Sequence, residues 1–220
     1  MKKFMISTTL LFVFFSAINA QIEEKMRKEN VVAGAIYEKN GQTIEGYIKI
    51  MGEEADPEFL TESSYSSLVD FQGNIYFIPK DVFESTPKIK SNSYKKYSPK
   101  NLSGYRYAHI EFEAVKYSDL SALGPGMIAK WIFMQRISKG KISTYYYYNP
   151  ELKNKVVMYR KNTDEKVRQV ATSNGIPGIN MKKFWDDCPY VKEKQEKDEY
   201  KGSNLEIRLA AIDDYNKYCE

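Results

Sequence analysis

Few residues in this chain have the types and spacing that catalysis or metal binding requires. The 220 residues include one histidine, His109, and two cysteines, Cys188 and Cys219. Zinc sites combine several histidine and cysteine ligands, and hydrolytic triads place a histidine beside a nucleophile and an acid. Because His109 shares an alternating strand pattern with Tyr105 and Tyr107, we interpret it as an ordinary strand histidine. We therefore predict no catalytic, cofactor-binding or metal-ligating residue.

Other catalytic motifs are equally weak. Serine and lysine recur at a spacing of three at Ser85 and Lys88, but the companion motifs of serine–lysine enzymes are missing. The sequence has no phosphate loop, dinucleotide fingerprint or nucleophile elbow. Adjacent carboxylates such as Asp186 and Asp187 diverge by about 100° on a helix, so they make no acid–base pair. These observations argue against an enzyme. They leave open a cofactor-free hydrolase that uses two carboxylates distant in sequence.

The first twenty residues have the three-part pattern of a secretory signal peptide. Lys2 and Lys3 give a basic start, residues 4–18 are mostly apolar, and small Ala20 precedes polar Gln21. No later stretch approaches the roughly 18 apolar residues of a membrane-spanning helix. We therefore expect a signal peptide over 1–20, no transmembrane segment after its cleavage, and a secreted protein in the periplasm or at the cell surface.

The charge of the chain excludes one class of partner. Lys and Arg number 33 against 29 Asp and Glu, for a formal charge of +4. Loss of Lys2 and Lys3 with the leader leaves the mature chain only weakly basic. Nucleic-acid binding rests on many phosphate contacts from basic residues, so we expect no nucleic-acid partner.

Export changes how the cysteines are interpreted. An oxidising compartment permits a disulfide between Cys188 and Cys219, and we favour that pairing. The alternative is two separate buried thiols.

Residues 31–38 and 43–50 are predicted to form a β-hairpin. They flank an Asn40-Gly41 turn, and Asn-Gly is a strong signal for tight hairpin turns. A second hairpin is expected to join 67–71 to 75–79. Further strands are expected over 105–117, 128–137 and 142–148, and in a last hairpin that joins 155–160 to 166–170, with edge strand or loop over 80–100.

The chain ends in a helical pattern. Pro189 suits the first turn of one helix, and Ser203 with Glu206 forms a capping box for the last one. A stripe at helical spacing contains one polar residue, Asn216; its members are Leu205, Leu209, Ile212, Asn216 and Cys219. We expect one α+β domain over 21–220, β-rich over 31–170 and helical over 180–219. Its architecture is a twisted antiparallel sheet or partly closed barrel followed by C-terminal helices.

Tyrosine is the one residue type in excess, with 18 copies, four of them consecutive. A strand would place Tyr145 and Tyr147 on one face, and Tyr146 and Tyr148 on the other. Such strips stack on sugar rings or anchor protein interfaces, so we treat these four as a candidate binding surface. The alternative is that they only pack within the sheet.

Several phrases together resemble a broad set of exported proteins of the phylum Bacteroidota. The phrases are QTIEGYI at 42–48, YSPKNLSGY at 97–105, the Lys-Gly turn and tyrosines at 139–148, FWDDCP at 184–189, and Tyr215-Asn216. The resemblance implies an exported location and a β-rich domain with C-terminal helices. It implies no activity, cofactor or catalytic residue.

We therefore expect a non-enzymatic cell-envelope module that binds a protein or a glycan. The alternative is a hydrolase acting on envelope glycan or peptide. A third interpretation is a small outer-membrane barrel, against which the charged helical C-terminus argues.

Overall fold

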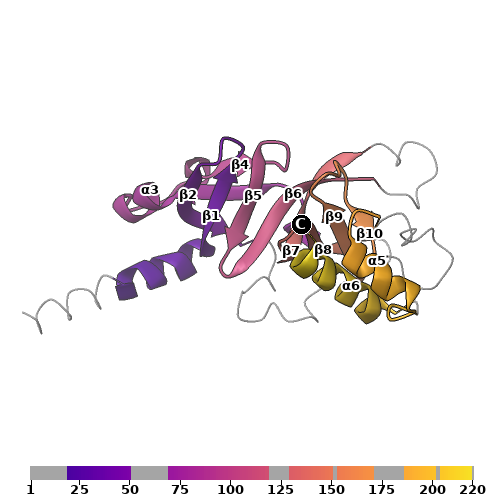
Figure 1. Cartoon of the computed structure of the whole chain (residues 1–220). Coiled ribbons are helices and arrows are strands. Elements are labelled where there is room, and N and C mark those ends of the chain that lie inside the picture. Colours follow the sequence, from indigo (N-terminus) through magenta and orange to yellow (C-terminus); the bar gives the residue numbers. More distant parts are fainter. Residues whose placement is uncertain are drawn as a thin grey trace, which may run out of the picture. The chain divides into compact units, whose positions relative to one another are not determined.

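A computed structural model describes residues 19–50, 69–118, 129–150, 153–170, 186–201 and 204–219. The chain forms two compact units, Met1–His109 and Ile110–Glu220 (Figure 1). From the sequence we expect one domain over 21–220. The division falls in the turn at Ala108 and His109, because the strands on either side pair mainly with strands of their own half.

In its described residues the first unit contains five strands, in the order β5-β1-β2-β3-β4. They are β1 (Val31–Glu38), β2 (Thr43–Lys49), β3 (Ile75–Pro79), β4 (Lys95–Tyr97) and β5 (Leu102–Tyr107). The predicted hairpin of β1 and β2 is confirmed, with Tyr37 opposite Thr43 at its closed end. Of its two turn residues only Gly41 has positive φ, at 90°, while the Asn40 side chain accepts a hydrogen bond from the Gln42 N–H.

Both faces of β2 are covered at residues 46–48, although its alternating pattern predicts one exposed face; Thr43 and Glu45 remain exposed. Tyr47, on the expected open face, is buried against Phe83 of helix α3 (Lys80–Ser85), with ring centroids 4.2 Å apart. A helix over residues 19–29 adds Ile22 and Met26 to the same apolar cluster. The residues that follow the predicted cleavage site are therefore part of the fold. The predicted signal peptide itself lies outside the described residues, except for 19 and 20.

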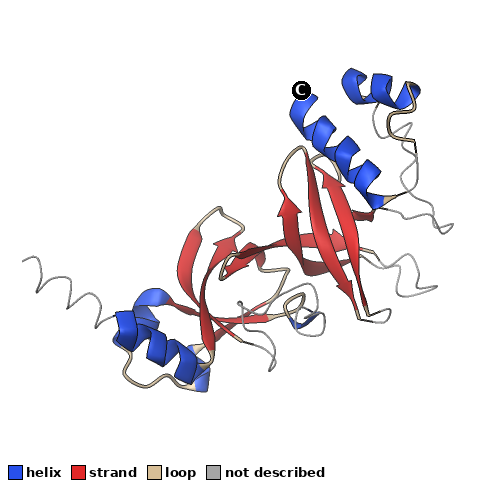
Figure 2. Ribbon diagram, turned by 90° about the horizontal axis from the view of Figure 1, so that it is seen from below, coloured by secondary structure: helices blue, strands red, loops and turns tan. Residues whose placement is uncertain are grey.

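The second unit has the open strand order β6-β7-β8-β9-β10. Figure 2 shows strands in red, with the helix that ends at the C-terminus lying beside them in blue. Its strands are β6 (Ile110–Tyr117), β7 (Lys130–Ser138), β8 (Ile142–Asn149), β9 (Asn154–Lys161) and β10 (Arg168–Gln169). The helices α5 (Pro189–Glu196) and α6 (Leu205–Tyr218) follow at the end of the chain. An isolated parallel bridge joins Lys116 to Lys166, so the sheet bends far enough for the segment before β10 to reach β6.

These elements confirm the α+β fold class. The strand pairings within each unit are antiparallel, and the helices α5 and α6 come last in the chain. Both strand orders are open, as expected for a sheet that is at most partly closed, and in the second unit the bridge between Lys116 and Lys166 links the segment before β10 to β6. Among the described residues, no helix has the length and apolar character needed to span a membrane.

Three local predictions differ from the structure. Residues 69–70 are helical rather than part of a strand, and β3 instead pairs with β2 and β4. The segment 80–100 contains helix α3 and a short 3-10 helix, η1 (Ser91–Ser93), before the edge strand β4. The last helix is capped by Asn204, whose side chain accepts from the Ile207 N–H at 2.8 Å, whereas Ser203, the predicted cap, lies outside the described residues.

Candidate functional site

The four consecutive tyrosines of β8 do not form an exposed surface, so that prediction is wrong. Tyr145, Tyr147 and Tyr148 are buried and Tyr146 is half-buried, because the sheet is covered on both faces. Tyr145 and Tyr147 belong to one apolar cluster, while Tyr146 packs against a second cluster that includes the C-terminal helices. These tyrosines serve the core.

Two of their hydroxyl groups donate hydrogen bonds inside the sheet. The Tyr145 hydroxyl donates to Glu113 Oε2 at 3.1 Å, and the Tyr148 hydroxyl donates to Gln135 Oε1 at 2.7 Å. Burial and the nearby Glu113 carboxylate raise the pKa of Tyr145 well above its ordinary value. The Tyr145 hydroxyl therefore stays protonated and acts as a donor within the core.

His109 lies exposed in the turn between β5 and β6, rather than within a strand as its pattern predicts. Ala108 before it has a φ of 52°, which ends the alternation. No group of three or more His, Cys, Asp or Glu side chains with the geometry of a metal site occurs among the described residues.

Two carboxylates, Glu111 and Glu113, share one face of β6. Residues two apart on a strand are about 7 Å apart, a separation that glycosidases also use. The oxygens of Glu113, however, accept hydrogen bonds from Arg160 and Tyr145. Arg136 lies 3.9 Å from Glu111 and 3.6 Å from Glu113. This network joins the four strands β6, β7, β8 and β9 through internal contacts that occupy the Glu113 oxygens.

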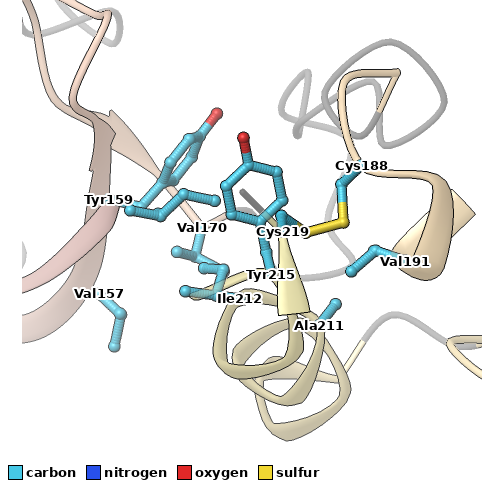
Figure 3. Packing of buried hydrophobic residues seen from close by; sticks show 10 residues of the cluster. Val157, Tyr159, Val170, Cys188, Val191, Ala211, Ile212, Tyr215 and Cys219 are labelled. Carbon is cyan, nitrogen blue, oxygen red and sulfur yellow. A yellow bond between two sulfur atoms is a disulfide. The ribbon is translucent and has the colours of Figure 1, made fainter. Parts of the chain in front are cut away.

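The C-terminal helices hold the predicted disulfide. Cys188 and Cys219 are bonded, with their Cα atoms 5.3 Å apart and a sequence separation of 31. Cys188 precedes α5, which begins at Pro189 as predicted, and Cys219 ends α6. Figure 3 shows the bond beside Val191 and Tyr215, within the apolar cluster that joins the two helices to the sheet.

Asn216, the polar member of the α6 stripe, binds the backbone of β8. Its Oδ1 accepts from the Ile142 N–H and its Nδ2 donates to the Ile142 carbonyl, both at 2.8 Å. The side-chain amide thus hydrogen-bonds to the backbone of Ile142 as a neighbouring β-strand would. The pairing of β7 with β8 ends before Ile142, at Ser138 and Thr144. Gly140 leaves room for the amide, since a Cβ there would lie 2.5 Å from the Asn216 side chain.

Two networks of similar composition surround α6. In the first, Asp187 Oδ2 accepts from Lys161 and, at 2.8 Å, from the Tyr215 hydroxyl. In the second, Asp214 Oδ2 accepts from Lys194 at 2.9 Å and from the Tyr200 hydroxyl. Each joins segments far apart in sequence through one carboxylate.

The pKa shifts in these networks favour fixed charges. Partial burial alone would raise the pKa of Asp187, but hydrogen bonds from Lys161 and Tyr215 outweigh it and hold that pKa below its ordinary value. The hydrogen bond to Asp214 raises the pKa of Lys194. A catalytic lysine or carboxylic acid at neutral pH needs the opposite shifts. The networks therefore act as structural ion pairs.

An exposed aromatic pair lies beside the disulfide. Tyr190 and Tyr218 are 38% and 45% exposed, and their ring centroids lie 4.3 Å apart. Lys194 Nζ lies 5.2 Å from the Tyr190 ring centroid, and Lys217 Nζ lies 4.9 Å from that of Tyr218. The other exposed large apolar side chains among the described residues are Val82 and Ile137. We call Tyr190 and Tyr218 the tyrosine pair.

Sequence reasoning missed this pair, although a signal for it existed. Tyr190 lies two residues after Cys188, and Tyr218 lies one residue before Cys219. A disulfide between those cysteines brings their neighbours together, so the predicted bond already implied that the two rings approach each other. The prediction was based instead on the four consecutive tyrosines of β8, which lie within the sheet.

Comparisons with known proteins add no assignment, since no family model, curated protein or solved structure matches the chain.

Proposed function

We propose that the protein is an exported, non-enzymatic interaction module of the cell envelope, and that the tyrosine pair is the centre of its contact surface. The observation that carries the proposal is the exposure of two large aromatic side chains in direct contact. Tyrosine is enriched at the energetic centres of interfaces, because it buries a large ring and still offers a hydroxyl group.

Two further features support this role. The leader pattern of residues 1–20 favours export, and a disulfide is typical of an oxidising compartment. The disulfide also links the two helices that carry the tyrosine pair, so less backbone freedom remains to be lost on binding. The partner class is an envelope protein or glycan.

Photo-cross-linking in living cells of the native source tests the proposal. One variant carries p-benzoylphenylalanine in place of Tyr218, and a matched variant carries it in place of Val82, which is exposed on α3 of the first unit. The protein is recovered with an antibody, so that no tag is added near Tyr218.

We expect a discrete adduct from the Tyr218 position and none from the Val82 position. A protein adduct would be identified by mass spectrometry, and a glycan adduct by its sugar content. Equal labelling at both positions, or no adduct at Tyr218, would contradict the proposed surface. Recovery of the protein from the cytoplasmic fraction with an intact leader would contradict the proposed export.

A further inference from the structure

We infer that a lysine-rich edge of the first unit binds the anionic headgroups of a phospholipid membrane surface. The residues involved belong to the other unit from the tyrosine pair, so this contact is independent of the proposed interaction surface. Its basis is the charge of residues 86–101, the exposure of their lysines and the way in which the sheet holds them.

The positive charge of the chain is concentrated in one segment. Residues 86–101 contain five lysines, no arginine and no Asp or Glu, a formal charge of +5. The whole chain carries +4, so all the other residues together carry 4 − 5 = −1. Adding α3, with one lysine and two acidic residues, still leaves 6 − 2 = +4 over residues 80–101. We call the five lysines the lysine strip: Lys88, Lys90, Lys95, Lys96 and Lys100.

The fold exposes the lysine strip and buries residues that lie between its lysines. Ile89 is buried in the apolar cluster that contains Phe83, and Tyr94 packs against the same cluster. Pro99 is buried in the turn between β4 and β5. All five lysines are exposed. Their ammonium groups are therefore presented on a segment that is attached to the unit at several points.

The strand β4 places lysines on both faces of a sheet edge. It is the last strand in the order of the first unit, and β3 is its partner among the described residues. Consecutive strand residues point to opposite faces, so Lys95 and Lys96 diverge. Lys95 Nζ lies 4.8 Å from the Tyr97 ring centroid, Lys96 Nζ lies 5.9 Å from that of Tyr76, and both rings are half-buried. The edge thus combines lysine and tyrosine, whose apolar bodies and polar tips suit a membrane–water interface.

Neighbouring side chains do not compensate the charge of the lysine strip. None of the five lysines forms an ion pair with a residue that the structure describes. One carboxylate acts on the segment: burial and, second, the charge of Glu29 raise the pKa of Tyr94 to about 12. A single carboxylate against five ammonium groups leaves the segment cationic. Such a cluster of lysines is attracted to an anionic lipid surface.

The composition of the strip favours phosphate headgroups over a carboxylate-bearing peptide. Arginine forms bidentate, geometrically specific bonds to carboxylates, and the strip contains none. Lysine acts as a point charge that requires no fixed partner geometry. The strip also surrounds the edge instead of lining one face, because its lysines lie on both faces of β4 and in the segments before and after it. This arrangement suits a continuous surface of headgroups better than one extended peptide.

Vesicle co-sedimentation of the full mature chain tests the inference. The probes are vesicles of phosphatidylcholine alone and vesicles that also contain phosphatidylglycerol. We expect binding to the anionic vesicles, weakening as salt rises, and no binding to the neutral ones. The variant Lys95→Gln/Lys96→Gln should lower the partition coefficient at least about tenfold, because each lysine near an anionic surface contributes about fivefold.

The matched control is Lys130→Gln/Lys192→Gln, which removes the same charge from exposed positions of β7 and α5. These two lysines likewise form no ion pair among the described residues. The control should bind within about twofold of the wild type, because its lysines lie outside the strip. Circular dichroism confirms that each variant is folded. Equal losses in the two variants, or no binding of the wild type to anionic vesicles, would overturn the inference.

Acetylation of the unaltered chain locates the contact without any substitution. An amine-reactive acetyl donor labels exposed lysines, and mass spectrometry compares the labelling with and without anionic vesicles. We expect protection of Lys95 and Lys96, and unchanged labelling of Lys130 and Lys192. Equal protection of all four lysines would contradict a contact at the strip.

A further variant separates the membrane from an occupant within the chain. Residues 51–68, which lie outside the described residues, contain five Asp or Glu and no Lys or Arg, the reverse of the lysine strip. The variant replaces their carboxylates by amides, at Glu53, Glu54, Asp56, Glu58 and Glu62. Vesicle binding that occurs only in this variant would assign the strip to the chain's own acidic segment. Release from the vesicles by a glutamate-rich peptide at equal charge would assign it to an acidic protein, and either result would overturn the inference.

Failure of the membrane contact is distinct from failure of the proposed function. An adduct at Tyr218 in cells, without affinity for anionic vesicles, would preserve the interaction module and reject the membrane contact. Vesicle binding through the lysine strip without an adduct at Tyr218 would do the reverse.

Discussion

The two units hold their parts together by opposite means. In the first, strands approach so closely that side chains are excluded: Gly34 and Gly46 are paired across β1 and β2. A Cβ on Gly34 would lie 2.1 Å from the Arg106 carbonyl oxygen, and one on Gly46 would lie 2.3 Å from that of Ile78. In the second, side chains attach the helices to the sheet through the disulfide, Asn216 and Asp187.

The difference predicts opposite sensitivities. A contact made by backbone against backbone fails when atoms are added, because nothing nearby can move aside cheaply. A contact made by side chains is weakened when atoms are removed. Loss of a hydrogen-bonding side chain leaves buried polar groups without partners, and loss of a disulfide gives the unfolded chain more conformational freedom. Four measurements test this contrast, beginning with the largest expected effect.

Removal of the disulfide should have the largest effect. In the chain-entropy model, closing a loop with a sequence separation of 31 contributes about 3–4 kcal/mol. We expect Cys188→Ala/Cys219→Ala to lower the free energy of unfolding by about that amount, measured by urea denaturation. Hydrogen exchange should rise in α5 and α6 and stay unchanged in β1 and β2. A loss below about 1 kcal/mol would show that packing alone holds the helices.

Gly46→Ala should lower the free energy of unfolding of the first unit by about 2–3 kcal/mol. The added Cβ would meet the Ile78 carbonyl and the Phe77 ring. The matched control is Gly73→Ala, where the nearest atom to a new Cβ is 3.9 Å away. The control should stay within about 0.5 kcal/mol of the wild type. Equal stability of the two variants would break the contrast between the units.

Asn216→Ala should destabilise the second unit by about 1–3 kcal/mol, because it leaves the N–H and carbonyl of Ile142 without their partner. Gly140→Ala should also destabilise it, since the new methyl group would meet the Asn216 side chain. The double variant should lose less stability than the two single variants lose together, because without the Asn216 side chain the new methyl group at position 140 no longer clashes with it. Full additivity in thermal unfolding would mean that the two residues do not interact.

Acidification should change the free energy of unfolding least, through the protonation of Asp187. The pKa of Asp187 is lowered in the folded protein, so its stabilising contribution is fully present above its unfolded pKa and is lost as the pH falls through the folded value. That window lies below about pH 4. The side chain is 54% exposed, so we expect Asp187→Asn to cost under about 1 kcal/mol at pH 7.

The neighbouring Asp186→Asn is the matched control, since Asp186 has no ion pair among the described residues. Urea midpoints from pH 3 to pH 7 should converge between the wild type and Asp187→Asn below pH 4, whereas the control should follow the wild type throughout. A gap that stays constant from pH 7 to pH 3 would assign the effect to the hydrogen bond from Tyr215, because a charge effect must shrink as the pH falls toward the folded pKa.

Local patterns predicted much of the fold. The Asn-Gly turn with its alternating arms gave the β1–β2 hairpin, and Pro189 marked the start of α5. The pairing of Cys188 with Cys219 followed from the number of cysteines and the expected compartment. The partners of β3 and the covered face of β2 were not predictable, because α3 and β4 decide both from positions distant in sequence.

The candidate site divides in the same way. Composition and spacing determined that catalytic and metal-binding constellations are sparse, that tyrosine is in excess, and that the last helix has an apolar stripe interrupted by Asn216. Only the tertiary structure decided which tyrosines are exposed: the consecutive ones of β8 lie inside the sheet, while Tyr190 and Tyr218 face outward beside the disulfide. The reason is physical. Periodicity states which residues share a face of their own element, but whether that face meets solvent depends on what packs against it.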